Sequence, residues 1–283
     1  MCGVASFRGS VVSFPKIMGF FAVLSFDSGL RTLVRRSLEE RHSIADTGSW
    51  ERMLHLVKER PLTAVVLDQA ALGEAPGPEA ALAALRAHFP SVAVVLVARP
   101  DADPNTLLRL GRTGTGALVL VRVDDLRQDV PRVADRALTR STDAMVTRAV
   151  SPYLAARELL VVRGALAGAV RGWDAEEVAL RLSLTRPHLS VLLKAVGLPS
   201  LGHLLVWSKL LHAGRWLGDP GRSAQSIARQ LDYSSGAAFR RALKNYTGTV
   251  PTTVRASGGL QFVLERFLGA CALRGRGFGE SVA

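Results

Sequence analysis

The chain has 283 residues, more than one ordinary domain holds, so its length predicts two domains. Apolar residues make up 48% of the chain and charged residues 21%, which excludes a protein that is disordered throughout. Lys and Arg outnumber Asp and Glu by 36 to 24. The resulting net charge of +12 indicates a polyanionic partner, either nucleic acid or an anionic membrane surface.

The positive charge is concentrated in the second half of the chain. Residues 151–283 hold 17 Lys and Arg against 8 Asp and Glu, whereas residues 1–150 hold 19 against 16. A polyanion is therefore expected to bind the C-terminal half.

Cysteine content and apolar runs bear on the compartment. The two cysteines, Cys2 and Cys271, stand at opposite ends of the chain, which favours a reducing cytoplasm over a disulfide framework. No apolar run approaches the roughly 18 residues that a membrane span needs. The apolar patch at 17–26 has no small-residue cleavage site after it, so a first buried strand is favoured over a signal peptide. Residues 1–17 are expected to be a disordered extension, unless translation starts at Met18 rather than Met1.

The N-terminal half alternates apolar strand-like runs with segments of helical periodicity. Strands are expected at 20–25, 64–67, 92–97 and 117–121, with a weakly marked one at 44–45. Helices are expected where apolar residues recur three and four apart, at 30–40, 50–58, 79–88, 105–112 and 130–138. Uninterrupted Val and Leu strands between helices predict a parallel sheet that is covered on both faces.

Ligands of such sheets bind outside the carboxyl ends of the strands, where Asp27 and Asp68 stand in this chain. The order of elements over roughly residues 19–140 resembles the CheY-like receiver domain of bacterial response regulators. The resemblance implies that Asp68 occupies the phosphoacceptor position. It also makes Asp27 a weak candidate metal ligand, as the survivor of an acidic pair that binds Mg²⁺.

At several positions this chain differs from the family in chemistry. Ser25 or Phe26 stands where the family has a second acidic residue, and Val97 or Ala98 stands where it has a Ser or Thr hydroxyl. Arg122-Val123 stands where Lys-Pro is usual. Because Mg²⁺ requires near-octahedral oxygen ligands, a missing carboxylate should lower metal affinity. We expect a degenerate, flavodoxin-like receiver kept as a dimerisation or partner-binding scaffold. Phosphorylation of Asp68 is the alternative.

The C-terminal half contains an internal repeat. From Ala179 the apolar partners fall at +3, +5, +10 and +14, and from Ala228 they fall at +3, +5, +11 and +15. Each copy predicts a short helix, a tight turn and a second helix, which is a helix-turn-helix unit. Thr185 and Ser235 stand where the N-cap of each second helix is expected. Between the copies, residues 201–217 predict a helix of about 24 Å. A connector of this scale can hold the two copies near one turn of DNA apart, a distance of about 34 Å.

The stretch from about Leu160 to Ala256 resembles the AraC/XylS-type DNA-binding domain. The second copy, from Ser226 to Pro251, carries the stronger match, and the resemblance covers about a third of the chain. The family usually has Gly at the Asp232 position, so slight strain is expected in the turn of the second copy.

Helical spacing predicts which side chains of the second copy face DNA. Phe239 and Leu243 form the core face, and the opposite face carries the candidate DNA-contacting residues. These candidates are Ser235, Gly236, Ala237, Arg240, Arg241 and Lys244. The resemblance places base readers at four of them, of which two are tiny, so readout is expected to rest on Arg240 and Arg241. Lys244 is expected to contact phosphate.

In the first copy, Leu189 and Leu193 are expected to face inward. The outward candidates are Pro187, His188, Ser190, Val191 and Lys194. Ser190 can pair with several bases and Val191 can meet a thymine methyl group, so the first copy is expected to be the weaker reader.

The sequence shows no metal-ligand spacing, no phosphate-binding glycine loop and no catalytic constellation, so no enzyme activity, metal or cofactor is expected. The expected segments are an extension at 1–17, a receiver-like domain at 18–140, a connecting helix at 141–159, an all-α double helix-turn-helix domain at 160–258, and a C-terminal helix and tail at 259–283.

These features favour a cytoplasmic, sequence-specific transcription regulator that binds double-stranded DNA as a homodimer, without membrane contact and with a possible protein partner for its receiver-like domain. The alternatives are a phosphorylation-activated response regulator that uses Asp68 and, in another class, a protein-interaction adaptor that does not bind DNA.

Overall fold

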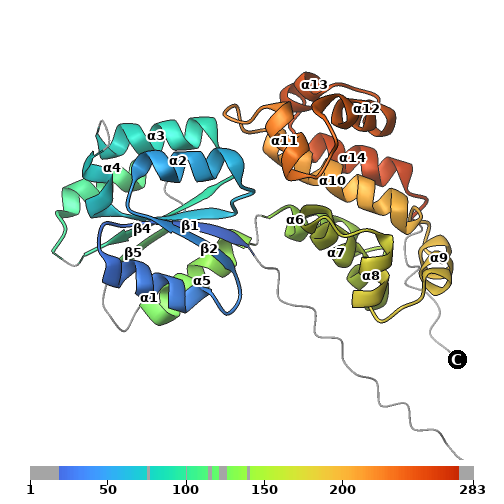
Figure 1. The fold of residues 1–283 in the computed structure, drawn as a ribbon, viewed down its shortest axis with the longest axis horizontal. Coiled ribbons are helices and arrows are strands. Elements are labelled where there is room, and N and C mark those ends of the chain that lie inside the picture. Colours follow the sequence, from blue (N-terminus) through green and yellow to red (C-terminus); the bar gives the residue numbers. More distant parts are fainter. Residues whose placement is uncertain are drawn as a thin grey trace, which may run out of the picture.

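The computed structural model describes residues 19–74, 77–99, 101–113, 117–120, 126–138 and 141–273. An α/β unit is followed along the chain by an all-helical unit (Figure 1). The expected extension at 1–17 and the question of Met1 or Met18 as the start lie outside the described residues. None of the helices in the described ranges combines the length and the apolar character of a membrane span.

Among the described residues, one sheet is formed by five parallel strands: β1 (Phe20–Leu24), β2 (Ser43–Thr47), β3 (Ala64–Asp68), β4 (Ala93–Ala98) and β5 (Ala117–Leu120). The strand order is β2-β1-β3-β4-β5, which is the doubly wound order of flavodoxin-like folds. The register places Leu67 between Leu24 and Leu96. The predicted parallel sheet is confirmed, including its weakly marked second strand.

Five α-helices of the described residues cover this sheet: α1 (Ser28–Leu38), α2 (Trp50–Glu59), α3 (Pro78–His88), α4 (Pro104–Arg112) and α5 (Leu126–Leu138). Alternate side chains of β1 point to opposite faces. Phe21 and Val23 belong to the apolar cluster of α1 and α5, whereas Ala22 and Leu24 belong to the cluster of α2 and α3. Figure 1 shows the two pairs of helices on opposite sides of the sheet.

Helix α5 begins four residues before the predicted start at 130. Leu126 is fully buried in the same cluster as Val130 and Val133, so burial against the sheet extends the helix toward its N-terminus. Pro131 therefore lies inside the helix. The predicted start at 130 would place it in the first turn, where proline is favoured.

The second unit contains nine helices among the described residues: α6 (Thr142–Val150), α7 (Ala156–Arg171), α8 (Ala175–Arg181), α9 (Arg186–Ala195), α10 (Leu201–Leu217), α11 (Ala224–Gln230), α12 (Gly236–Thr247), α13 (Pro251–Ala256) and α14 (Leu260–Ala270). The predicted connector at 201–217 is α10, which is buried along most of its length and lies at the centre of this unit. The helix expected within 259–283 corresponds to α14.

Two of the expected boundaries cut through one packed core. The boundary between 159 and 160 falls inside α7, and the apolar cluster around α10 includes Val146 of α6 and Phe267 of α14. The boundaries at 159/160 and 258/259 are therefore corrected. The segments outside them, which contain α6 and α14, bury apolar side chains in the same core as the helix-turn-helix copies.

The loop between α10 and α11 joins the two units. Asp219 is fully buried, and its carboxylate accepts hydrogen bonds from the Ser91 amide at 2.8 Å and the Ser91 hydroxyl at 2.6 Å. The same carboxylate accepts from Arg222 Nε at 2.9 Å. Arg222 Nη1 also donates to the Arg60 carbonyl at 3.2 Å, so this ion pair bridges the units.

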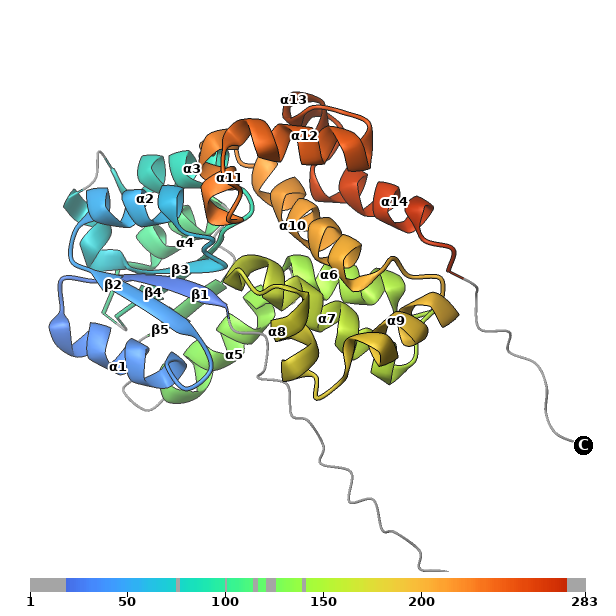
Figure 2. The same ribbon diagram turned by 45° about the vertical axis from the view of Figure 1, so that its right-hand side comes forward.

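Close approach of the backbone extends this contact. The Gly221 N–H donates to the His88 carbonyl at 2.9 Å, and a Cβ at Gly221 would lie 2.5 Å from the Phe89 ring. Ser226 and Gln230 of α11 donate to the Lys58 carbonyl at the end of α2. In Figure 2, α11 lies beside the helices of the α/β unit.

Candidate DNA-binding interface

Both helix-turn-helix copies bend their chain through the same unusual backbone conformation. Ser183 and Asp232, four residues after the aligned alanines Ala179 and Ala228, have φ values of +53° and +56°. They are the only non-glycine residues in the left-handed region among those that the structure describes. The strain expected at Asp232 is confirmed, and the first copy shares it, so the repeat holds at the level of the backbone.

The predicted N-caps are also confirmed. The Thr185 hydroxyl accepts from the His188 amide at 3.4 Å, and the Ser235 hydroxyl accepts from the Ala238 amide at 3.1 Å. Each cap starts the second helix of its copy, so α9 and α12 are the candidate reading helices.

Helix α12 buries one face and exposes the other. Phe239 and Leu243 are fully buried, whereas Arg240, Arg241 and Lys244 are exposed. Neither arginine side chain makes a hydrogen bond or an ion pair with any described residue, so both guanidinium groups are available to a ligand. Ala237 is exposed beside them.

Gly236 was expected on this open face, and that placement is wrong. Gly236 is buried, and its N–H donates to Gln225 Oε1 of α11 at 3.1 Å. A Cβ at Gly236 would lie 2.2 Å from the same oxygen. A larger residue here would displace the Gln225 side chain from this hydrogen bond. Spacing within one helix could not reveal this contact, because it joins α11 to α12.

Helix α9 of the first copy presents a less charged face. Leu189 and Leu193 are buried, as expected. All five outward candidates are exposed: Pro187, His188, Ser190, Val191 and Lys194. Val191 is 71% exposed, so its side chain can contact a ligand.

Side chains other than the candidate DNA-contacting residues hold the second copy on α10. Tyr246 near the end of α12 contacts His203 through a 2.6 Å hydrogen bond and stacks edge-on against Trp207. Arg255 of α13 donates to the carbonyls of Leu217 and Arg222. These contacts join residues more than 30 positions apart, so no spacing along the chain predicts them.

The predicted receiver site brings its two aspartates to one edge of the sheet but gives them separate roles. Asp68 is 5% exposed, and its carboxylate accepts from the Ser25 hydroxyl at 2.6 Å and from the Ala70 amide at 3.1 Å. Asp27 caps α1 and forms a 3.4 Å ion pair with Arg99. Ser25 thus faces Asp68 where the family has an acidic residue.

Ser25, Val97 and Ala98, which stand at receiver-family positions near Asp68, carry no carboxylate. No group of three or more His, Cys, Asp or Glu side chains that could hold a metal occurs among the described residues. Val97 and Ala98 are buried strand residues without a hydroxyl, and Arg122-Val123 lies outside the described part of the chain.

A family model matches part of the all-helical unit. Residues 178–257 match the family described as a helix-turn-helix domain, of the AraC type. No curated protein matches the chain.

Several solved structures are similar to parts of this chain. A response regulator from Thermotoga maritima is 15% identical and covers 42% of this chain and 99% of its own, with a TM-score of 0.37. Full-length FixJ from B. japonicum is 11% identical and covers 80% of this chain and 95% of its own, with a TM-score of 0.38. RcsB from Salmonella enterica serovar Typhimurium is 13% identical and covers 66% of this chain and 97% of its own, with a TM-score of 0.36. The fold assignment itself rests on the strand order.

The strand order and the family match together define a protein with a flavodoxin-like α/β unit and a helix-turn-helix segment. Within that class, its helix-turn-helix segment is of the AraC type.

Proposed function

We propose that this protein is a cytoplasmic, sequence-specific transcription regulator that reads double-stranded DNA chiefly through α12. The observation that carries the proposal is the pair Arg240 and Arg241, exposed on the reading helix of an AraC-type segment and free of any partner among the described residues. An arginine can donate two hydrogen bonds to guanine O6 and N7, which gives about 1–3 kcal/mol of discrimination.

The other candidate residues have supporting roles in this proposal. Lys244, a point charge on the same exposed face, contacts phosphate, as does Lys194 of α9. Ser190 and Val191 contact bases weakly, with Pro187 and His188 beside them at the start of α9. Ser235 acts through its cap, which sets the start of α12, and Ala237 leaves room for the arginines.

A gel-shift and footprinting series tests the assignment of the readers. The double variant Arg240→Ala/Arg241→Ala should lose its preference for the selected site, while weaker, salt-sensitive binding persists. Arg148→Ala/Arg157→Ala is the matched control, because it removes the same charge from exposed positions of α6 and α7. Unchanged sequence preference in the reader variant, or equal loss in the control, refutes the assignment.

The receiver-like unit is proposed to work without phosphorylation, as a regulatory and dimerisation domain that a protein partner can also bind. The buried Asp68 carboxylate already accepts two hydrogen bonds, and Ser25 replaces a carboxylate that Mg²⁺ binding would need. Incubation with Mg²⁺ and acetyl phosphate should leave the mass of the protein unchanged. Added mass of one phosphoryl group that Asp68→Asn abolishes would instead establish a phosphorylation-activated regulator.

A homodimer fits the proposal, since two subunits on paired half-sites multiply specificity. Sedimentation of the free protein and of its complex with one or two half-sites measures the stoichiometry. A protein that binds no duplex DNA at low salt in these assays would be an interaction adaptor.

A further inference from the structure

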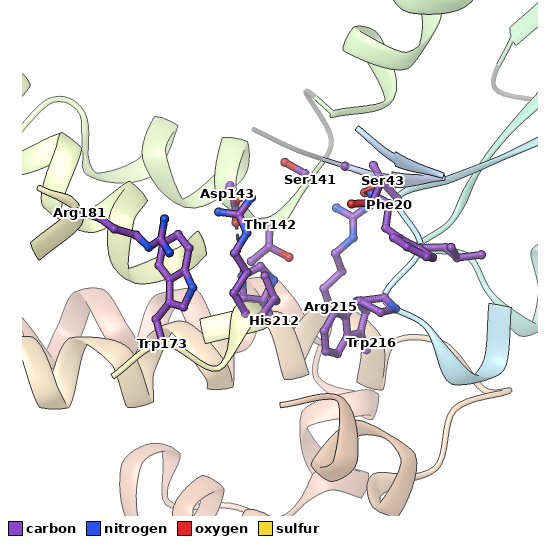
Figure 3. A pocket seen from close by; sticks show the side chains of 16 residues that line it. Phe20, Ser43, Ser141, Thr142, Asp143, Trp173, Arg181, His212, Arg215 and Trp216 are labelled. Atoms are coloured by element: carbon purple, nitrogen blue, oxygen red, sulfur yellow. Dashed lines mark hydrogen bonds and ion pairs between the residues drawn. The ribbon is translucent and has the colours of Figure 1, made fainter. Parts of the chain in front are cut away.

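A partly open cavity of about 430 Å³ lies between the two units, and the proposed function leaves it unused. Its walls come from both units, with Phe20 and Ser43 at the ends of β1 and β2 and Trp216 on α10 (Figure 3). This volume lies within the range of small-molecule sites, which often form at domain interfaces.

The cavity is rich in positive charge. Arg171, Arg181 and Arg215 line it, against the single carboxylate of Asp143. His212 adds no charge at neutral pH, because burial lowers the pKa of its imidazole below the usual value, although Asp143 partly opposes the shift. An organic anion would therefore be attracted to this cavity.

Two of the arginines are engaged with other groups. Arg181 pairs with Glu177 at 2.6 Å, and Arg215 donates to the Ser91 carbonyl at 2.6 Å. Arg171 makes no hydrogen bond or ion pair with a described residue, and its guanidinium carbon lies 5.0 Å from the centre of the Trp173 ring. Its planar fork of N–H donors is thus open to an oxyanion, and the guanidinium of Arg181 lies over the same ring at 4.1 Å.

Asp143 supplies the complementary group. Its Oδ1 is buried and accepts no hydrogen bond from the described residues, while His212 Nε2 lies 3.4 Å away and 3.1 Å from the Leu166 carbonyl. An unsatisfied buried carboxylate oxygen is costly, and an ammonium or hydroxyl donor would relieve that cost.

We infer that this cavity binds a small organic acid whose oxyanion pairs with Arg171, whose amino or hydroxyl group donates to Asp143, and whose apolar body packs against Phe20 and Trp216. Amino acids and 2-hydroxy acids share this chemistry. Because the walls belong to both units, the bound acid would fix their docked arrangement and act as an effector of the proposed regulator.

The test uses the full-length protein without DNA, so that its result is independent of the proposed function. L-phenylalanine, L-leucine and 3-phenyllactate are titrated by calorimetry and thermal shift up to about 10 mM, with inorganic phosphate for comparison. At least one of the organic acids should bind and raise the melting temperature. Preference for the amino or the hydroxy acid identifies the donor that Asp143 accepts.

Arg171→Met keeps the packing stem on Trp173 and removes the charge, and it should weaken binding by about tenfold or more. Asp143→Asn should have a similar effect. Arg163→Met, on the same helix and outside the cavity, is the control and should bind normally. Melting temperatures without ligand verify folding of each variant.

The proposal is overturned if none of the three organic acids binds, if phosphate binds equally well, or if both cavity variants bind like the control. DNA affinity of the same variants is measured separately, so loss of the effector site and loss of the DNA-binding function are distinguishable.

Discussion

The two helix-turn-helix copies share a backbone but present different chemistry. Both have a left-handed residue in the turn and a hydroxyl cap on the reading helix. The second copy exposes Arg240 and Arg241, whereas the first exposes Ser190 and Val191. Repetition of an apolar pattern thus fixes the scaffold, while the exposed residues are free to diverge because they carry no packing.

The copies also differ in their attachment to the α/β unit. The second copy follows the buried pair Asp219–Arg222, and its helix α11 donates hydrogen bonds to the end of α2 through Ser226 and Gln230. The first copy begins at Asp174, an exposed N-cap that bonds only within its own helix start. The second copy is therefore where a change in the α/β unit can reach the DNA-binding residues.

The largest effect is expected from substitution of the buried aspartate. Asp219→Ala leaves Arg222 buried without its partner and removes two hydrogen bonds to Ser91, which should cost about 3–5 kcal/mol of the free energy of unfolding. Asp174→Ala in the first copy removes an exposed cap and should cost about 1 kcal/mol. Denaturant unfolding measures both, and equal losses would contradict the difference in attachment.

The reading helices should differ next most strongly. Arg240→Ala alone should cost about 1–3 kcal/mol of preference for the selected site. Ser190→Ala/Val191→Ala should cost less than about 1 kcal/mol, since a hydroxyl and a methyl contact discriminate weakly. Competition binding against a scrambled duplex reports both values, and a larger loss from the α9 variant would reverse the assignment of the stronger reader.

Caps should give a smaller difference. Ser235→Ala and Thr185→Ala should each destabilise by about 1 kcal/mol. The Ser235 cap is shorter and partly buried, whereas the Thr185 cap is longer and exposed, so the loss at Ser235 should be larger. Thermal unfolding measures which of the two substitutions destabilises more. Thr185→Val removes the hydroxyl but keeps the volume of the side chain, so it isolates the contribution of the hydroxyl.

The turn residues should show the smallest effect. A non-glycine residue in the left-handed region costs about 1–2 kcal/mol, and the flexibility of glycine offsets about half of that gain. Ser183→Gly and Asp232→Gly should therefore stabilise the protein by under about 1 kcal/mol, with the larger gain at Ser183 because Asp tolerates this conformation better. Destabilisation by both substitutions would show that their side chains make unrecognised contacts.

Local rules predicted much of the candidate site. Apolar spacing correctly identified the buried faces of α9 and α12, and the hydroxyl positions identified both caps. The same rules did not predict the burial of Gly236, because this burial comes from Gln225 on another helix. The start of α5 escaped them for a similar reason, since Leu126 is helical through its packing on the sheet.

By itself, the sequence determined the strands and helices of the α/β unit, the repeated turn and the exposed arginines, because each depends on residues a few positions apart. Only the tertiary structure decided the pairing of Asp219 with Ser91 and the cavity between Arg171 and Phe20. These features join segments more than a hundred residues apart, and no periodicity along the chain encodes which surfaces meet when the two units dock.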